Sequence, residues 1–175
     1  MAKKKNQTTK QEDSLVDVSG EETHYIVQCE DVRLITSSLK PLIVEESGER
    51  KSNFAFKIRA VVEGQTAYSY LDVLARHYIE EGPEEVEGFE LRFVLMGTFC
   101  AEADVSSEDL GEFVKMYTLT VLWPYAREYA SDQIRRAGGN VMVLPIINPQ
   151  VVTEHIVEND LVEVKIISSE EKVQQ

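Results

Sequence analysis

The stretch Leu119–Gly139, "LTVLWPYAREYASDQIRRAGG", decides the predicted fold, because it is typical of a helix on both sides of a central proline. A proline inside a helix removes one backbone donor and clashes with the preceding turn, at a cost of about 3 kcal/mol. Two large aromatic residues, Trp123 and Tyr125, flank Pro124. We expect the proline either to bend or restart the helix, turning this aromatic corner towards a sheet, or only to shape the core.

The predicted helix extends in both directions from this stretch. Ser106 is a good N-cap residue, and Glu108 and Asp109 follow in the first turn, where the helix dipole favours negative charge. Gly138 and Gly139 end the helix after two arginines. Between these limits, apolar residues recur at helical spacing: Leu110, Phe113, Val114, Tyr117 and Val121.

Four strand-like runs precede the helix, over residues 25–39, 54–64, 66–81 and 88–103, with loops at 44–53 and 80–88. The first run breaks its alternation near Cys29–Asp31, which predicts a bulge. The last alternates apolar and charged residues, as in a sheet with one covered and one wet face. The sequence therefore predicts an α+β fold: a four-stranded antiparallel sheet with a long proline-interrupted helix packed on one face. Residues 150–160 and 161–168 favour a short helix and a further strand.

Composition and charge limit the class of protein. We predict a disordered polar tail over residues 1–22, a single domain over 23–168 and a polar tail over 169–175. The net charge of −13 repels phosphate backbones, so a nucleic-acid partner is not expected. We find no signal peptide and no apolar run near the roughly 20 residues that span a bilayer. We therefore expect a cytoplasmic protein without membrane insertion, whose Cys29 and Cys100 are free buried thiols.

The residue patterns of catalytic sites are missing from the sequence. It has no glycine-rich phosphate loop, no nucleophile elbow and no His/Cys cluster with metal-ligand spacing. Its adjacent carboxylates fall in turns and tails, where nothing separates their pKa values for acid/base catalysis. We expect neither an enzyme nor a metal or cofactor site. A surplus of apolar and aromatic residues instead indicates oligomer interfaces or a groove for apolar ligands.

A run of seven adjacent residues around Pro124 resembles the helix motif of the SecB protein-export chaperones, Leu-Phe-Pro-Tyr-Ala-Arg-Glu. Here tryptophan replaces the phenylalanine, and the matching residues are Leu122, Trp123, Pro124, Tyr125, Ala126, Arg127 and Glu128. Shorter stretches resemble other family segments: Leu144–Asn148, Gly97–Phe99 and the pair Asp31-Val32. The resemblance covers about residues 24–148.

The resemblance implies a homotetramer, a dimer of dimers, that holds unfolded polypeptides or preproteins in hydrophobic grooves without ATP during protein export. An alternative on the same fold is a chaperone dedicated to one partner, such as the antitoxin of a toxin–antitoxin pair. Flexible clients of varied sequence require adaptable apolar surface rather than a shaped polar pocket. The residues that we expect to contact a client are Phe54, Phe56, Phe89, Phe93, Tyr125, Leu144, Ile146 and Ile147.

The sequence departs from the SecB pattern at two places. In the family, acidic residues on the wet sheet face dock the SecA translocation motor. Asp31 and Glu90 fit such a face, but Ile35 and Arg92 do not. After Asn148, Pro149 stands where the family has phenylalanine, and residues 161–168 match no family segment. These departures favour the dedicated chaperone somewhat.

Overall fold

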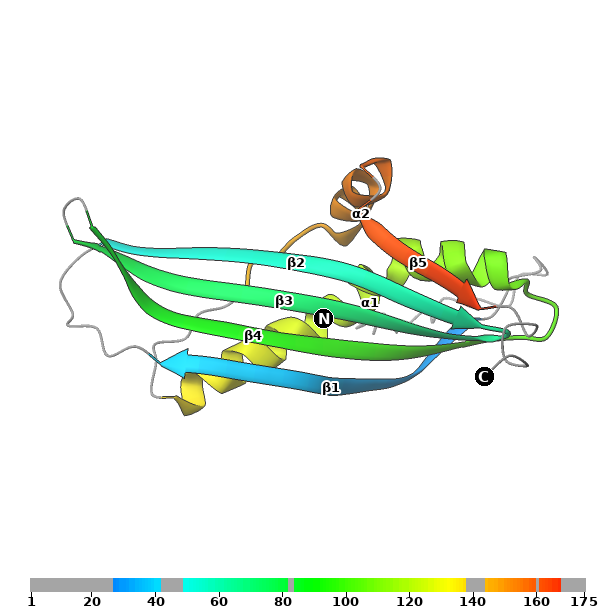
Figure 1. Cartoon of the computed structure of the whole chain (residues 1–175), viewed down its shortest axis with the longest axis horizontal. Coiled ribbons are helices and arrows are strands. Elements are labelled where there is room, and N and C mark those ends of the chain that lie inside the picture. The colour runs from blue at the N-terminus through cyan, green and yellow to red at the C-terminus, as the bar shows by residue number, and fades with distance from the viewer. Residues whose placement is uncertain (1–26, 42–48, 82–83, 138–143, 160, 168–175) are drawn as a thin grey trace, which may run out of the picture.

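The computed structural model describes residues 27–41, 49–81, 84–137, 144–159 and 161–167. The predicted tails 1–22 and 169–175 lie outside these residues. In chain order the elements are β1 (Val27–Pro41), β2 (Glu49–Glu63), β3 (Thr66–Glu81), β4 (Glu84–Ala101), α1 (Ser107–Arg136), α2 (Pro149–Glu158) and β5 (Val162–Ile167) (Figure 1). Within these residues, no helix is both long and apolar enough to cross a membrane.

The strands form one mixed sheet with the order β1-β4-β3-β2-β5. The pairs β1–β4, β4–β3 and β3–β2 are antiparallel, whereas β5 pairs with β2 in parallel. The α+β prediction is confirmed, but the prediction of four antiparallel strands is wrong. The chain returns along α1 and through α2 before reaching the edge of β2, and such a crossover connection brings β5 in parallel (Figure 1).

Strand boundaries differ from the prediction mainly at the loops. β2 begins at Glu49 and β4 at Glu84, so the loops expected over 44–53 and 80–88 are shorter than predicted. Charged residues near these strand ends resemble loop residues in sequence, although they pair in the sheet. The predicted bulge is confirmed by a register shift between Cys29 and Asp31, and a second shift lies between Leu34 and Thr36.

The long helix α1 is continuous through Pro124, so the proline does not divide it into two helices, and the predicted restart is wrong. Pro124 and Thr120, whose carbonyl would accept the missing backbone bond, are both exposed, so water can replace that bond. The predicted N-cap is confirmed, because the Ser106 Oγ accepts a 3.0 Å hydrogen bond from the Asp109 backbone N–H. Trp123 is buried while Tyr125 is about half exposed, so the two aromatic residues face different surroundings.

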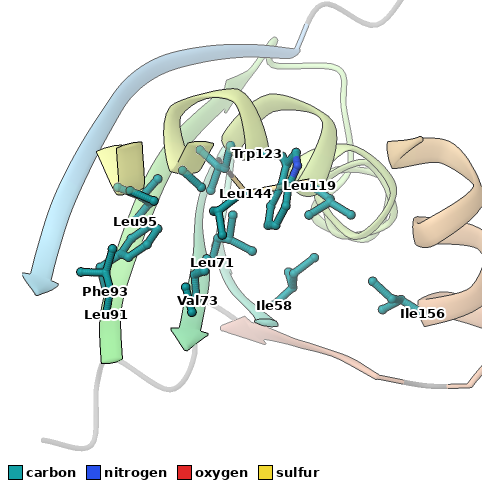
Figure 2. Close-up of a cluster of buried hydrophobic side chains, with 14 of the residues drawn as sticks. Ile58, Leu71, Val73, Leu91, Phe93, Leu95, Leu119, Trp123, Leu144 and Ile156 are labelled. Carbon is teal, nitrogen blue, oxygen red and sulfur yellow. The ribbon is translucent and has the colours of Figure 1, made fainter. Parts of the chain in front are cut away.

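The core lies between α1 and one face of the sheet, and α2 adds Ile156 to it (Figure 2). Strand alternation determines which sheet residues enter the core. In β3, Leu71, Val73 and Ala75 are buried, while the intervening side chains point to the other face. Besides the buried Trp123, the largest fully buried side chains of this cluster are Phe93, Ile58, Leu71, Leu91, Leu119, Leu122, Ile134 and Leu144. The opposite face of the sheet, which we call the open face, is not covered by either described helix (Figure 1).

Two buried glycines provide a matched test of this packing. A Cβ atom on Gly97 would lie 2.9 Å from the Phe99 ring and 3.0 Å from Leu122, so Gly97→Ala should destabilise the fold by about 1–3 kcal/mol. A Cβ atom on Gly111 in α1 meets only ordinary contacts of 3.6 Å. Gly111→Ala should therefore stabilise by about 0.5–1 kcal/mol through helix propensity. Urea denaturation measures both values, and equal effects of the two substitutions would contradict the packing.

Candidate functional site

Two side chains of the SecB-like motif fix the segment 144–148 against α1. The Trp123 Nε1 donates a hydrogen bond to the Pro145 carbonyl at 3.2 Å, and the Arg127 Nε donates one to the Leu144 carbonyl at 3.0 Å. The Leu144 side chain is fully buried. Ile146, two residues further on, is 84% exposed. The motif thus anchors this segment and leaves one of its large apolar side chains in solvent.

An aromatic cluster on β2 continues the surface beside this segment. Phe54 and Phe56 pack against Trp123 with ring centroids 6.0 and 5.6 Å apart, and both remain half-buried. Ile147 is half-buried and packs against the main hydrophobic core, to which Trp123 belongs. At the start of α2, Val151 is 58% exposed. We call the apolar residues of this region the linker strip, which consists of Phe54, Phe56, Ile146, Ile147 and Val151.

A second surface feature, of mixed polar and apolar lining, lies where edge strand β1 and β4 meet the C-terminal half of α1. A groove of about 420 Å³ opens there, with Val32, Leu95, Tyr125 and Tyr129 as its apolar lining. Its polar lining consists of Glu128, Asp132 and Arg136. We call this feature the β1 groove.

Edge strand β1 also carries exposed apolar side chains. Leu34 is 45% and Ile35 50% exposed, and a β-bulge lies at this position. Tyr117 of α1 is about half exposed as well. The sequence had singled out Ile35 only as a departure from an acidic face, and neither Leu34 nor Tyr117 was predicted as a contact residue, although the adjacent pair Leu34-Ile35 interrupts the strand alternation.

The eight predicted client-contacting residues lie in different surroundings. Phe93 and Leu144 are fully buried in the core, so their side chains are not available to a client in this structure. Phe89 is half-buried and stacks on His77 with centroids 5.4 Å apart, in a part of the sheet away from Trp123. Tyr125 lines the β1 groove. The four remaining residues belong to the linker strip: Phe54, Phe56, Ile146 and Ile147.

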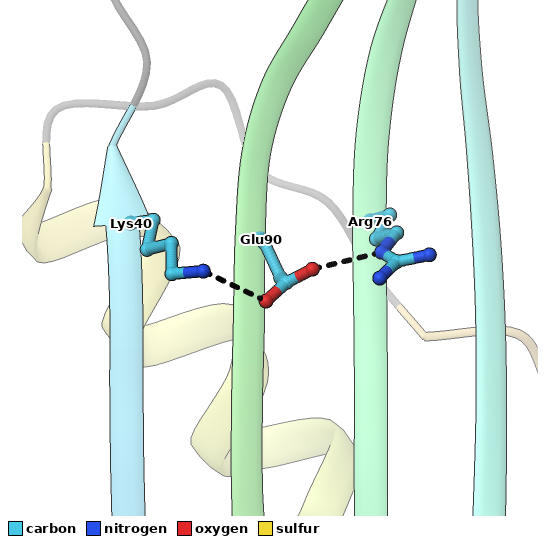
Figure 3. Close-up of polar contacts among 3 residues, drawn as sticks. All are labelled: Lys40, Arg76 and Glu90. Carbon is cyan, nitrogen blue, oxygen red and sulfur yellow. Dashed lines mark hydrogen bonds and ion pairs between the residues drawn. The ribbon is translucent and has the colours of Figure 1, made fainter.

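The two acidic residues predicted on the wet face are both held by cations. Glu90 lies between Lys40 of β1 and Arg76 of β3, with N–O distances of 3.5 and 2.9 Å (Figure 3). The hydrogen bond from Arg76, aided by the charge of Lys40, lowers the pKa of the Glu90 carboxyl. Asp31 forms an ion pair with Arg33. This part of the open face therefore does not present unpaired carboxylates.

The lowered pKa of Glu90 predicts how its contribution to stability depends on pH. Because the folded-state pKa lies below the unfolded value of about 4.3, the contribution is present above that value and is lost as the pH falls through the folded-state pKa. The difference in unfolding free energy between wild type and Glu90→Gln should therefore be larger at neutral pH than in acid. Urea denaturation across this range measures it. If the unfolding free energies of wild type and Glu90→Gln changed in parallel with pH, the prediction would be wrong. In an Arg76→Gln background, the effect of Glu90→Gln on the unfolding free energy at neutral pH should be smaller.

The thiols and carboxylates do not form a reactive centre within the described part of the chain. There, no group of three or more His, Cys, Asp or Glu side chains is placed to hold a metal ion. Both cysteines are free, but Cys29 is exposed and Cys100 only half-buried, so the prediction of buried thiols is wrong for both residues. Desolvation raises the pKa of both cysteine thiols, which favours the protonated, less nucleophilic form.

Comparison with solved structures finds a similar fold in a SecB-like chaperone from Mycobacterium tuberculosis, solved in complex with a ChAD peptide from an antitoxin. The match has a TM-score of 0.61 and 16% sequence identity, and covers 70% of this chain and 91% of that chain. The fold is SecB-like. A protein of unknown function from Streptococcus agalactiae also matches, with a TM-score of 0.34 and 8% identity over 70% of this chain and 99% of that chain. We draw no conclusion from this weak match. No protein-family model and no curated protein matches the sequence.

The SecB-like resemblance predicted from the helix motif is thus confirmed at the level of the fold. The residues behind that prediction have identifiable roles in the structure, because Trp123 and Arg127 anchor the segment 144–148. At 16% identity the comparison establishes the fold alone.

Proposed function

We propose that the protein is a SecB-like chaperone that binds flexible, non-native polypeptide segments without ATP, and that it serves a dedicated partner such as an antitoxin. The observation that carries this proposal is the SecB-like fold, since one solved structure of this fold holds an antitoxin peptide. That example supports a dedicated chaperone more than a general export factor.

The chemistry of the linker strip agrees with this proposal. Ile146 and Val151 are exposed, and the half-buried rings of Phe54 and Phe56 lie beside the segment that Trp123 holds. Covering apolar surface contributes about 25 cal/mol per Å², so an extended segment with several apolar side chains gains affinity without nucleotide hydrolysis. Because such segments are accessible only when the client is unfolded, binding delays client folding or aggregation by mass action.

We further propose that the chain assembles as a homotetramer, a dimer of dimers. Exposed Leu34 and Ile35 on edge strand β1, together with Tyr117 and Tyr125 on α1, are apolar surface that a second copy would cover. An unpaired edge strand also offers backbone hydrogen-bonding groups to another strand. In this assembly the β1 groove serves subunit contact and the linker strip remains available to clients.

A role in general protein export has less support. Docking of a SecA-type motor was expected to use unpaired acidic residues on the open face, but Glu90 and Asp31 are engaged by Arg76, Lys40 and Arg33. A cytoplasmic location remains part of the proposal because the function requires access to newly made polypeptides.

An aggregation assay without nucleotide tests the proposed function. Several unrelated chemically unfolded proteins and an aggregation-prone antitoxin are diluted into buffer with the full chain, and native mass spectrometry measures the assembly. We expect strong protection of the antitoxin, weaker protection of the unrelated proteins, and a tetramer mass. Equal protection of all clients would favour the general export chaperone. A monomer that protects none of them would overturn the proposal.

A further inference from the structure

The centre of the open face is an apolar and aromatic patch formed by three neighbouring strands. Tyr70 of β3 pairs with Arg59 of β2 on one side and with Met96 of β4 on the other. Because alternate residues of a strand point to the same face, the neighbouring rows add further apolar side chains to this face. The patch consists of Val61, Tyr68, Tyr70, Leu74 and Met96, with the largely buried Val94 between them. Figure 3 shows that α1 lies behind the sheet when this face, which also carries Lys40, Glu90 and Arg76, is viewed from the front.

Basic side chains surround this patch. Arg59 lies over the Tyr70 ring, 5.5 Å from its centroid, and leaves its guanidinium group exposed. Arg92, opposite Leu74, and Lys165, opposite Val61, are exposed and form no ion pair with any other described residue. The remaining basic residues of the ring are Arg33, paired with Asp31, and Lys57, paired with Glu163 at 3.5 Å.

The charge of this surface differs from that of the chain. The four rows of the patch hold five basic residues and three acidic ones, Asp31, Asp72 and Glu163, and the next row adds Glu63, whereas the chain as a whole carries a net charge of −13. The glutamates of the β3–β4 hairpin, such as Glu80 paired with Glu85, follow Leu74 by about 20 Å along the strand. This separation exceeds the Debye length of about 8 Å at physiological salt, so the charges of the hairpin glutamates are largely screened at the basic ring.

We propose that the open face is a second docking surface, which binds an acidic polypeptide segment of a separate partner protein. The guanidinium groups of Arg59 and Arg92, which form no ion pair with a described residue, are suited to bind carboxylates in two-point contacts. The patch between them takes the apolar side chains of the same segment. A long phosphate backbone fits less well, because beyond the ring it would meet the acidic hairpin, whereas a short peptide would not.

This surface is independent of the proposed chaperone function, because it lies on the face of the sheet opposite the core side chains and Trp123. Its partner also differs in chemistry from an unfolded client, which the linker strip selects by apolar contact alone. Experiments can therefore disprove binding at the open face without disproving client binding at the linker strip, and the reverse.

Binding of a fluorescein-labelled peptide composed of glutamate and leucine to the full chain tests the proposal. We expect binding that weakens with salt, and at least about tenfold weaker binding by Arg59→Glu/Arg92→Glu, mainly through slower association. The control Lys115→Glu/Arg135→Glu makes the same charge change on α1 and should retain binding. If the double glutamate variant unfolds, Arg59→Gln/Arg92→Gln removes the same two charges with a milder change. Ile146→Asp alters the linker strip instead and should retain binding of the acidic peptide.

Four results would overturn the proposal: no binding of the peptide, equal weakening by the α1 control, loss of binding in Ile146→Asp but not in the arginine variants, and tighter binding of a single-stranded DNA of equal charge. Residues 1–22 contain an acidic stretch, "EDSLVDVSGEE". Deleting them distinguishes a separate partner protein from this segment of the chain itself as the occupant of the open face. Unchanged affinity supports a separate partner. A tenfold or greater gain in affinity would instead identify the chain's own N-terminal segment as the occupant.

Discussion

Replacement of Trp123 by alanine should lower the free energy of unfolding by about 3–5 kcal/mol. The indole is buried against Phe54 and Phe56 of β2, and its N–H anchors the Pro145 carbonyl. The substitution therefore creates a cavity between helix and sheet and also releases the segment 144–148 from α1. Urea denaturation followed by circular dichroism measures the loss without depending on tryptophan fluorescence.

Trp123→Phe is the matched control for this prediction. Phenylalanine, the residue that the SecB motif has at this position, keeps most of the ring contacts but cannot donate to Pro145. We expect a smaller loss than for alanine, of which about 1 kcal/mol is the missing hydrogen bond. If alanine and phenylalanine destabilised the protein equally, or if alanine cost less than about 1 kcal/mol, the proposed organisation around Trp123 would be wrong.

Ile146→Asp should abolish most client binding while leaving the fold intact. Because the Ile146 side chain is 84% exposed, its replacement should change the unfolding free energy by less than about 0.5 kcal/mol. A carboxylate in the linker strip would have to be desolvated beneath an apolar client segment, which opposes binding. We expect at least a tenfold loss in affinity for an unfolded polypeptide, equivalent to about 1.4 kcal/mol, measured by fluorescence anisotropy.

Thr120→Asp is the control for this variant, since it adds the same charge at an exposed position on α1. It should bind clients as the wild type does. Normal binding by Ile146→Asp, or an equal loss in the Thr120 variant, would show that the linker strip is not the client site.

Much of the fold could be predicted because local residue patterns decide it. The alternation through 66–81 predicted β3 with the boundaries that the structure has, and the Ser106 cap with its acidic first turn predicted the start of α1. Pro124 was misleading on one point. A proline predicts an interruption, but its cost is reduced where the released carbonyl faces water, and exposure is a tertiary property.

The parts that could not be predicted depend on contacts between distant segments. Residues 162–167 alternate like a strand, but only the path of α1 and α2 places them in parallel beside β2. Phe89 and Phe93 share one strand face, yet only Phe93 is fully buried, packed against Tyr129 with centroids 4.9 Å apart. The sequence pattern predicts that face but not how far the helix covers it, so both residues were predicted as client contacts.

The basic character of the open face was also only partly visible in the sequence. Arg92 was recognised as a departure from an acidic face. Its relation to Arg59 and Lys165 depends on the register of four strands, and the overall charge of −13 indicates the opposite sign. Local composition cannot show which charged residues of separate strands gather on one face.

The single tryptophan of the chain allows a direct test of the central claim, that a non-native polypeptide binds beside the Trp123 cluster without nucleotide. A reduced and alkylated protein that cannot refold is titrated into the full chain while Trp123 emission is recorded, using a client without tryptophan. We predict a saturable change in emission with the unfolded client, none with its native form, and a strongly weakened response in Ile146→Asp. No saturable response, or an equal response to the folded client, would contradict the account.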